Sequence, residues 1–119
     1  MNLKQLNEIV SGAVVIENNP DQEIAHIFST DLMSDALALV DGGEDTMILT
    51  GLCNMQTLRT AEMLDINTIL FVRNKYPDEE MIAYAKRMHF NMYSTAYTMY
   101  ETCGLLFKAG LKPWDKHLT

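Results

Sequence analysis

Apolar runs with the length of strands alternate with helical segments along the second half of the chain. The runs at residues 46–50, 68–72 and 91–94 are short, continuous and apolar, and helical spacing of apolar residues follows each one. Strands that are joined by helices of ten or more residues pair in parallel, and parallel sheets are covered on both faces. The pattern therefore predicts an α/β fold with a mostly parallel sheet, in which these three strands run in the same direction.

The first forty residues predict one helix, two further strands and a second helix. Leu3, Leu6 and Val10 have helical spacing, and residues 13–16 and 24–28 have the composition of strands. Residues 17–21 contain Asn, Pro and Asp, which favour a loop. We therefore expect a three-layer fold around a five-stranded sheet. No linker or repeat divides the chain, so residues 1–119 are predicted to form a single domain.

Capping residues predict where four of the helices begin. Asp31 is expected to accept a hydrogen bond from the backbone N–H of Ser34, and Asn54 is expected to cap the next helix. Pro77 is placed at the first position of a third helix, where its fixed φ suits the backbone. Thr98 and the glutamate three residues after it have the form of a capping box.

The charge of the chain limits its partners. The 119 residues carry a formal net charge of −7, which repels nucleic-acid phosphates and anionic lipid. No apolar run approaches the roughly 18 residues of a membrane-spanning helix, and the polar amino terminus lacks a signal-peptide core. We expect no nucleic acid or membrane partner and a cytoplasmic location. Cys53 and Cys103 are isolated in sequence, which predicts two reduced, partly buried thiols; a redox pair is the alternative.

The sequence lacks the common catalytic motifs, so it gives little support to an enzymatic function. The sequence contains no phosphate-binding GxxxxGK[ST] loop, no GxGxxG and no GxSxG. The three histidines are far apart and have no paired ligand, so we expect no zinc and no cofactor. Asp31 and Asp35 are four residues apart and could share a helix face, as an acid–base pair or a magnesium site would require. Helix capping is the stronger interpretation of both residues.

Small polar residues at the predicted strand ends are the best candidates for binding a ligand. In parallel sheets, ligands bind outside the carboxyl ends of the strands, where helix amino termini can hold a phosphate or carboxylate. Arg73 could add a bidentate contact to such an anion. The candidate residues are Ser29, Thr30, Thr50, Gly51, Asn54, Arg73, Ser94 and Thr95. The same residue types also cap helices and make turns, so a purely structural role stays open beside an anion or nucleotide pocket.

The order of these segments resembles the DRTGG domain family. The resemblance covers nearly the whole chain and is most specific at residues 28–37 (FSTDLMSDAL) and 94–104 (STAYTMYETCG). Domains of this family occur alone or attached to CBS-domain pyrophosphatases and phosphate acetyltransferases. They are related in fold to the amino-terminal domain of HPr kinase/phosphorylase. The resemblance implies a three-layer α/β fold and frequent dimers, and it does not imply catalysis.

The chain departs from the family at the residues that give the family its name. Cys53 and Asn54 stand where relatives have Asp-Arg, and Val72, Arg73 and Asn74 stand where relatives have Thr-Gly-Gly. We predict a non-catalytic regulatory or protein-interaction domain that forms a homodimer, with another regulatory protein or enzyme as a further candidate partner. The alternative is a sensor of a nucleotide or other phosphate-containing anion at the strand ends. A metal-dependent enzyme that uses two aspartates is the third and weakest interpretation.

Overall fold

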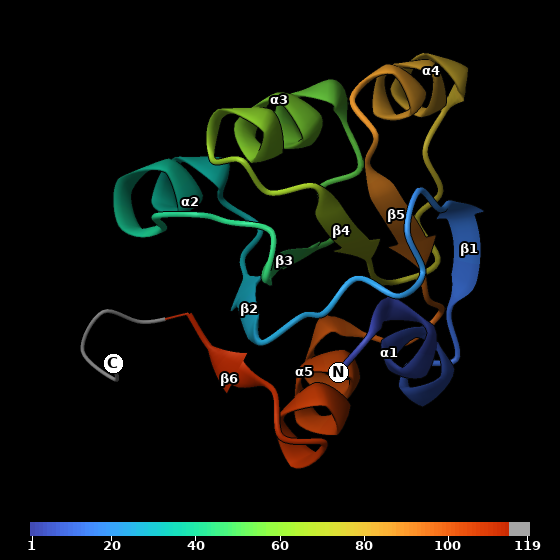
Figure 1. Cartoon of the computed structure of the whole chain (residues 1–119), viewed down its shortest axis with the longest axis vertical. Coiled ribbons are helices and arrows are strands. Elements are labelled where there is room, and N and C mark those ends of the chain that lie inside the picture. Colours follow the sequence, from blue (N-terminus) through green and yellow to red (C-terminus); the bar gives the residue numbers. More distant parts are fainter. Residues whose placement is uncertain (115–119) are drawn as a thin grey trace.

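A single six-stranded sheet forms the centre of the computed structural model, which describes residues 1–114 (Figure 1). The strand order is β1-β5-β4-β3-β2-β6; β1 is antiparallel to β5, and all other neighbours are parallel. The strands are β1 (Ala13–Ile16), β2 (His26–Ser29), β3 (Thr46–Thr50), β4 (Thr68–Phe71), β5 (Asn91–Ser94) and β6 (Lys112–Pro113). The helices are α1 (Leu3–Ile9), α2 (Met33–Leu39), α3 (Met55–Met63), α4 (Glu79–Arg87) and α5 (Met99–Lys108).

Helices cover both faces of the sheet, as the pattern of apolar residues predicts. The chain passes from β2 to β5 through neighbouring strands in one direction, and crossovers of one hand then place α2, α3 and α4 on the same face. Side chains of these three helices form one buried cluster with residues such as Ile48 and Ile69. Helices α1 and α5 cover the other face, where Leu6 and Leu106 pack in a second cluster. The three-layer α/β prediction is confirmed.

The sheet differs from the prediction at its edges. The three strands predicted to be parallel are β3, β4 and β5, and they are parallel. Strand β2 begins two residues later than expected, because Ile24 instead donates its backbone N–H to the Met1 carbonyl. The sixth strand, β6, was not predicted, since two residues are too few to show periodicity. It pairs with β2 at the edge of the sheet, where a proline is tolerated.

Helix caps follow the sequence signals in part. Asn54 accepts a hydrogen bond from the N–H of Thr57 (3.0 Å), and Thr98 forms the predicted capping box. The placement of Pro77 is wrong by two positions, because Asp78 is the N-cap of α4 and accepts from Met81 (2.9 Å). Within residues 1–114, no helix has the length and apolar character needed to span a bilayer.

Candidate functional site

The connections of the sheet define where a crevice can form at its carboxyl edge. Strand β4 is followed by α4 on one face, whereas its neighbour β5 is followed by α5 on the other face. Ligands in open α/β sheets bind where neighbouring connections diverge in this way. The segments that leave these two strands begin at residues 72 and 95, so they form the first part of the candidate site.

Asp31 organises the carboxyl ends of β2 and β3. Its Oδ1 accepts hydrogen bonds from the Gly51 N–H (2.8 Å) and from the Thr50 hydroxyl (3.3 Å). The expectation that Asp31 caps α2 is therefore wrong: the N-cap is Leu32, which makes no side-chain cap hydrogen bond. The reason is the parallel pairing of β2 with β3, which places a buried turn N–H within reach of the carboxylate.

The turn after β4 holds two non-glycine residues in the left-handed region of φ. Arg73 and Asn74 both have φ of 59°, and the Lys75 N–H donates to the Val72 carbonyl (3.4 Å) across them. A left-handed backbone costs an L-residue roughly 1–2 kcal/mol relative to glycine. The turn is anchored to the segment after β5, since the Arg73 N–H donates to the Tyr97 carbonyl (2.8 Å). The Asn74 N–H donates to the carbonyl of residue 95 at the same distance, 2.8 Å.

This backbone places the Arg73 guanidinium over Gly51. Its Nη2 lies 3.6 Å from Asp31 Oδ2, and both side chains are close to half exposed (49% and 45%). A Cβ atom at position 51 would lie only 2.1 Å from that Nη2, so the absence of a side chain at Gly51 makes room for the guanidinium. An ion pair this exposed and this long adds little stability. The guanidinium therefore keeps exposed donors for a ligand.

The other candidates do not join this cluster around Arg73, Gly51 and Thr50. Asn54 caps α3, and Thr30 forms a turn by accepting from the N–H two residues later (2.9 Å). The buried Thr95 hydroxyl donates to the carbonyl of residue 10 (2.7 Å), and the Ser94 hydroxyl donates to the carbonyl of residue 75. Ser29 lines a small hollow beside α5. The structure thus places five of the eight candidates in capping, turn or distant positions.

Cys53 lies half-buried at the same edge of the sheet. Burial raises the pKa of its thiol to about 11, and the negative charge of Asp78 acts in the same direction, against the opposing charge of Lys75. A thiol with such a pKa is almost fully protonated near neutral pH, and the protonated form is a poor nucleophile. Cys53 and Cys103 are both free and partly buried, as predicted.

The two aspartates of the metal-site interpretation do not share a helix face. Asp31 precedes the N-cap of α2 and faces β3, whereas Asp35 lies in the first turn of that helix. Across residues 1–114, no group of three or more His, Cys, Asp or Glu side chains is arranged to hold a metal ion.

Two features of the site were missed at the level of sequence. The first is the role of Asp31, whose only signal is its position two residues after a strand end. The second is the left-handed turn at Arg73 and Asn74, which could have been inferred from the paired glycines that the DRTGG domain family has at these positions.

Two larger hollows lie away from this cluster. One, of about 610 Å³, lies beside residues 65–67 and 88–90. The other, of about 720 Å³, lies on α5.

Comparisons with known proteins identify the fold. No family model matches the sequence, and no curated protein matches it. A similar solved structure is that of the CBS and DRTGG domains of the regulatory region of Clostridium perfringens pyrophosphatase, complexed with the activator diadenosine tetraphosphate. The TM-score is 0.71 at 13% sequence identity, and the match covers 88% of this chain and 45% of that chain. The chain thus has a DRTGG-like fold, and it spans less than half the length of that structure.

Proposed function

We propose that this chain is a non-catalytic regulatory domain that senses a small anionic ligand, a nucleotide or other phosphate compound, at the carboxyl edge of its sheet. Arg73 carries the proposal: its guanidinium is half exposed and lies over Gly51, beside the ends of β2 and β3. A phosphate can accept two parallel hydrogen bonds from one guanidinium. The single Asp31 contact at 3.6 Å is weak enough for such an anion to compete with it.

The strained backbone at Arg73 supports a role in binding. The resembling family has Gly-Gly at these two positions, and glycine adopts positive φ without cost. This chain has Arg and Asn there, both with φ of 59°. Strained residues of this kind concentrate at functional sites, where the role of the side chain offsets the energetic cost of the backbone conformation. In this proposal the strain is retained because it directs the guanidinium over Gly51.

Chemistry and the similar structure both support a phosphate-containing ligand. That pyrophosphatase regulatory region was solved with diadenosine tetraphosphate, a ligand rich in phosphate. In the present chain, the first turn of α3 begins four residues after Gly51 and has backbone N–H groups without helical partners. A helix amino terminus favours anions. This helix end follows the turn that the Arg73 guanidinium covers, and it is a second feature that favours a phosphate group.

A ligand screen with one matched pair of variants tests the proposal. Thermal shifts would be measured over adenine mono- and dinucleotides, including diadenosine tetraphosphate, and inorganic phosphate. At one hundred times its dissociation constant, a ligand adds about 2.7 kcal/mol to the free energy of unfolding. Arg73→Ala should weaken the binding of the ligand that the screen identifies by about 1.5–3 kcal/mol, the range for a hydrogen bond to a charged group.

Arg59→Ala is the control, because it removes the same charge from an exposed position in the middle of α3. It should leave the affinity unchanged. Equal weakening by both variants would mean that only the overall charge matters. A panel without any shift would contradict the sensing function.

A second candidate function, protein interaction through a homodimer, is supported by a different surface. Tyr100 and Phe107 on α5 are 89% and 73% exposed. Large apolar side chains that are exposed together commonly mark interaction sites. A regulatory domain can use both functions, since one lies at the sheet edge and the other on a helix.

A further inference from the structure

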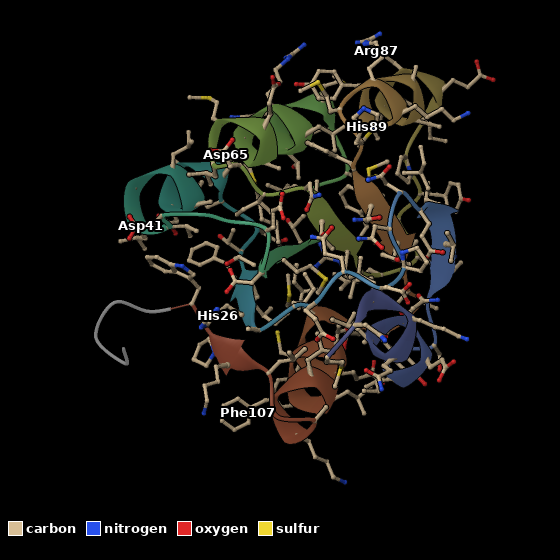
Figure 2. The ribbon with its side chains drawn as sticks, viewed as in Figure 1. His26, Asp41, Asp65, Arg87, His89 and Phe107 are labelled. Atoms are coloured by element: carbon tan, nitrogen blue, oxygen red, sulfur yellow. The ribbon has the colours of Figure 1, made fainter. Side chains whose placement is uncertain are left out.

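Helix α5 has an apolar face that is largely exposed, with Cys103 at one side of it packing partly against the core. Tyr100, Cys103, Gly104 and Phe107 follow the i, i+3, i+4, i+7 spacing of one helix face. We call these four residues the α5 outer face. The opposite side of the helix is buried against the sheet through Thr102 and Leu106. Figure 2 shows the Phe107 ring extending away from the body of the molecule.

The α5 outer face is hollowed at its centre. A groove of about 720 Å³ runs over it and is also lined by Glu101 and Lys108. A Cβ atom at Gly104 would meet nothing within 4 Å, so the middle of the helix is open to close approach. A second hollow of about 150 Å³ shares Cys103 and Phe107 with this groove and extends toward Pro113. The two form one apolar surface.

We propose that the α5 outer face binds the same face of a second copy of this chain, with the two helices antiparallel across a two-fold axis close to Gly104. The inference deepens the homodimer of the proposed function by naming its interface. Such an axis brings Tyr100 of one copy opposite Phe107 of the other, twice. The glycines at the crossing let the helix backbones approach closely, and each aromatic ring packs beside the gap that a glycine leaves. Isologous contacts of this kind are the commonest form of dimer.

The charges on this face complement each other in the antiparallel orientation. Glu101 and Lys108 are seven residues apart, so they flank the α5 outer face on the same side. Two antiparallel helices in contact bring these flanks together, and Glu101 of each copy then faces Lys108 of the other. The chain as a whole carries a net charge of −7, which repels a second copy. A locally balanced face is therefore a favourable place for self-association.

The exposed aromatic rings of α5 can supply about half of the area that a specific dimer interface needs. Tyrosine and phenylalanine side chains bury about 150–250 Å² each, so the four exposed rings of two copies would supply about 500–800 Å². Specific interfaces begin at about 1,200 Å² of total buried surface. The interface therefore requires about 400–700 Å² more from the surface around the rings, which includes Cys103, Gly104 and the second hollow.

Light scattering on the full chain and on three variants tests the interface. The full chain should have twice the monomer mass of 13.5 kDa. Gly104→Arg should be monomeric, because the new side chain blocks the crossing. It should keep or raise the melting temperature of the monomer, because the site has free space and glycine is a poor helix former. Phe107→Glu should also be monomeric.

Met63→Glu is the matched control, since Met63 on α3 is 73% exposed, the same fraction as Phe107. It should remain a dimer. A full chain that is monomeric at high micromolar concentration would overturn both this interface and the proposed homodimer, without affecting the anion site. A dimer that persists in folded Gly104→Arg and Phe107→Glu would overturn the α5 interface alone and leave the homodimer standing.

Discussion

The carboxylate of Asp31 stabilises a turn on the neighbouring strand. Its hydrogen bond with the Gly51 N–H joins residues that are twenty positions apart in sequence. Gly51 is buried, so its N–H has little access to water. A buried donor without a partner costs more than an average hydrogen bond contributes, and this asymmetry determines what a substitution at Asp31 does.

Asp31→Ala should lower the free energy of unfolding by about 1–3 kcal/mol, the cost of an unsatisfied buried donor. Asp31→Asn keeps an acceptor oxygen and should lose clearly less. Urea denaturation of the two variants checks the difference. Asp35→Ala is the control, because Asp35 is exposed in the first turn of α2, where a carboxylate contributes about 0.3–1 kcal/mol. Equal losses for Asp31→Ala and Asp31→Asn would contradict the assigned hydrogen bond.

Arg73→Gly should be more stable than Arg73→Ala. Both variants lose the guanidinium, but only glycine relieves the left-handed backbone at φ of 59°. The relief of roughly 1–2 kcal/mol is reduced by the greater freedom of glycine in the unfolded chain, which leaves a difference of about 0.5–1 kcal/mol. Chemical denaturation measures it. If Arg73→Ala were the more stable of the two, the turn would not be strained.

At the scale of elements, α5 depends on its first turn. The Thr98 hydroxyl accepts from the Glu101 N–H (3.2 Å), and the Glu101 carboxylate accepts from the Thr98 N–H (3.1 Å). The helix then presents one face to the sheet and leaves the α5 outer face exposed. Its start therefore sets the direction in which that face is displayed.

Thr98→Ala should cost about 1 kcal/mol of stability, as the loss of an N-cap side chain typically does. Thr98→Ser keeps the hydroxyl and should retain most of that stability. Thermal unfolding followed by circular dichroism checks both variants. A serine variant as unstable as the alanine variant would indicate that the methyl group, and not the cap, is responsible.

At the scale of the whole molecule, the end of the described chain ties the two faces of the sheet together. Helix α5 covers one face, yet Trp114 packs against the core cluster of α2, α3 and α4 on the other. Between them, the edge strand β6 pairs with β2, and the backbone N–H of Trp114 donates to the Ile27 carbonyl (3.0 Å). We expect the domain to unfold as one unit.

Fluorescence of Trp114, the only tryptophan of the chain, reports on this contact. Its unfolding transition in urea should coincide with the transition seen by far-ultraviolet circular dichroism, as two-state behaviour requires. Tyr76→Phe, a change at an exposed position, should leave both transitions unaltered. A fluorescence change at lower urea would show that the segment detaches before the domain unfolds.

The sequence by itself determined the elements whose signals are local. Apolar periodicity identified β3, β4 and β5 and the helices between them, and the caps at Asn54 and Thr98 follow from residues three positions apart. These signals are readable because a helix turn or a strand repeat is set by near neighbours along the chain.

Only the tertiary structure decided how the strand ends meet. Asp31 reaches Gly51 across the β2–β3 pair, and the turn at Arg73 is held by the carbonyl of Tyr97 from the segment after β5. The two-residue β6 exists because β2 offers it an edge. Each of these contacts joins residues that are far apart in sequence, and any of several polar groups could have satisfied the same donors locally. Strand pairing determines which polar group satisfies each donor, because it sets which strand ends lie side by side.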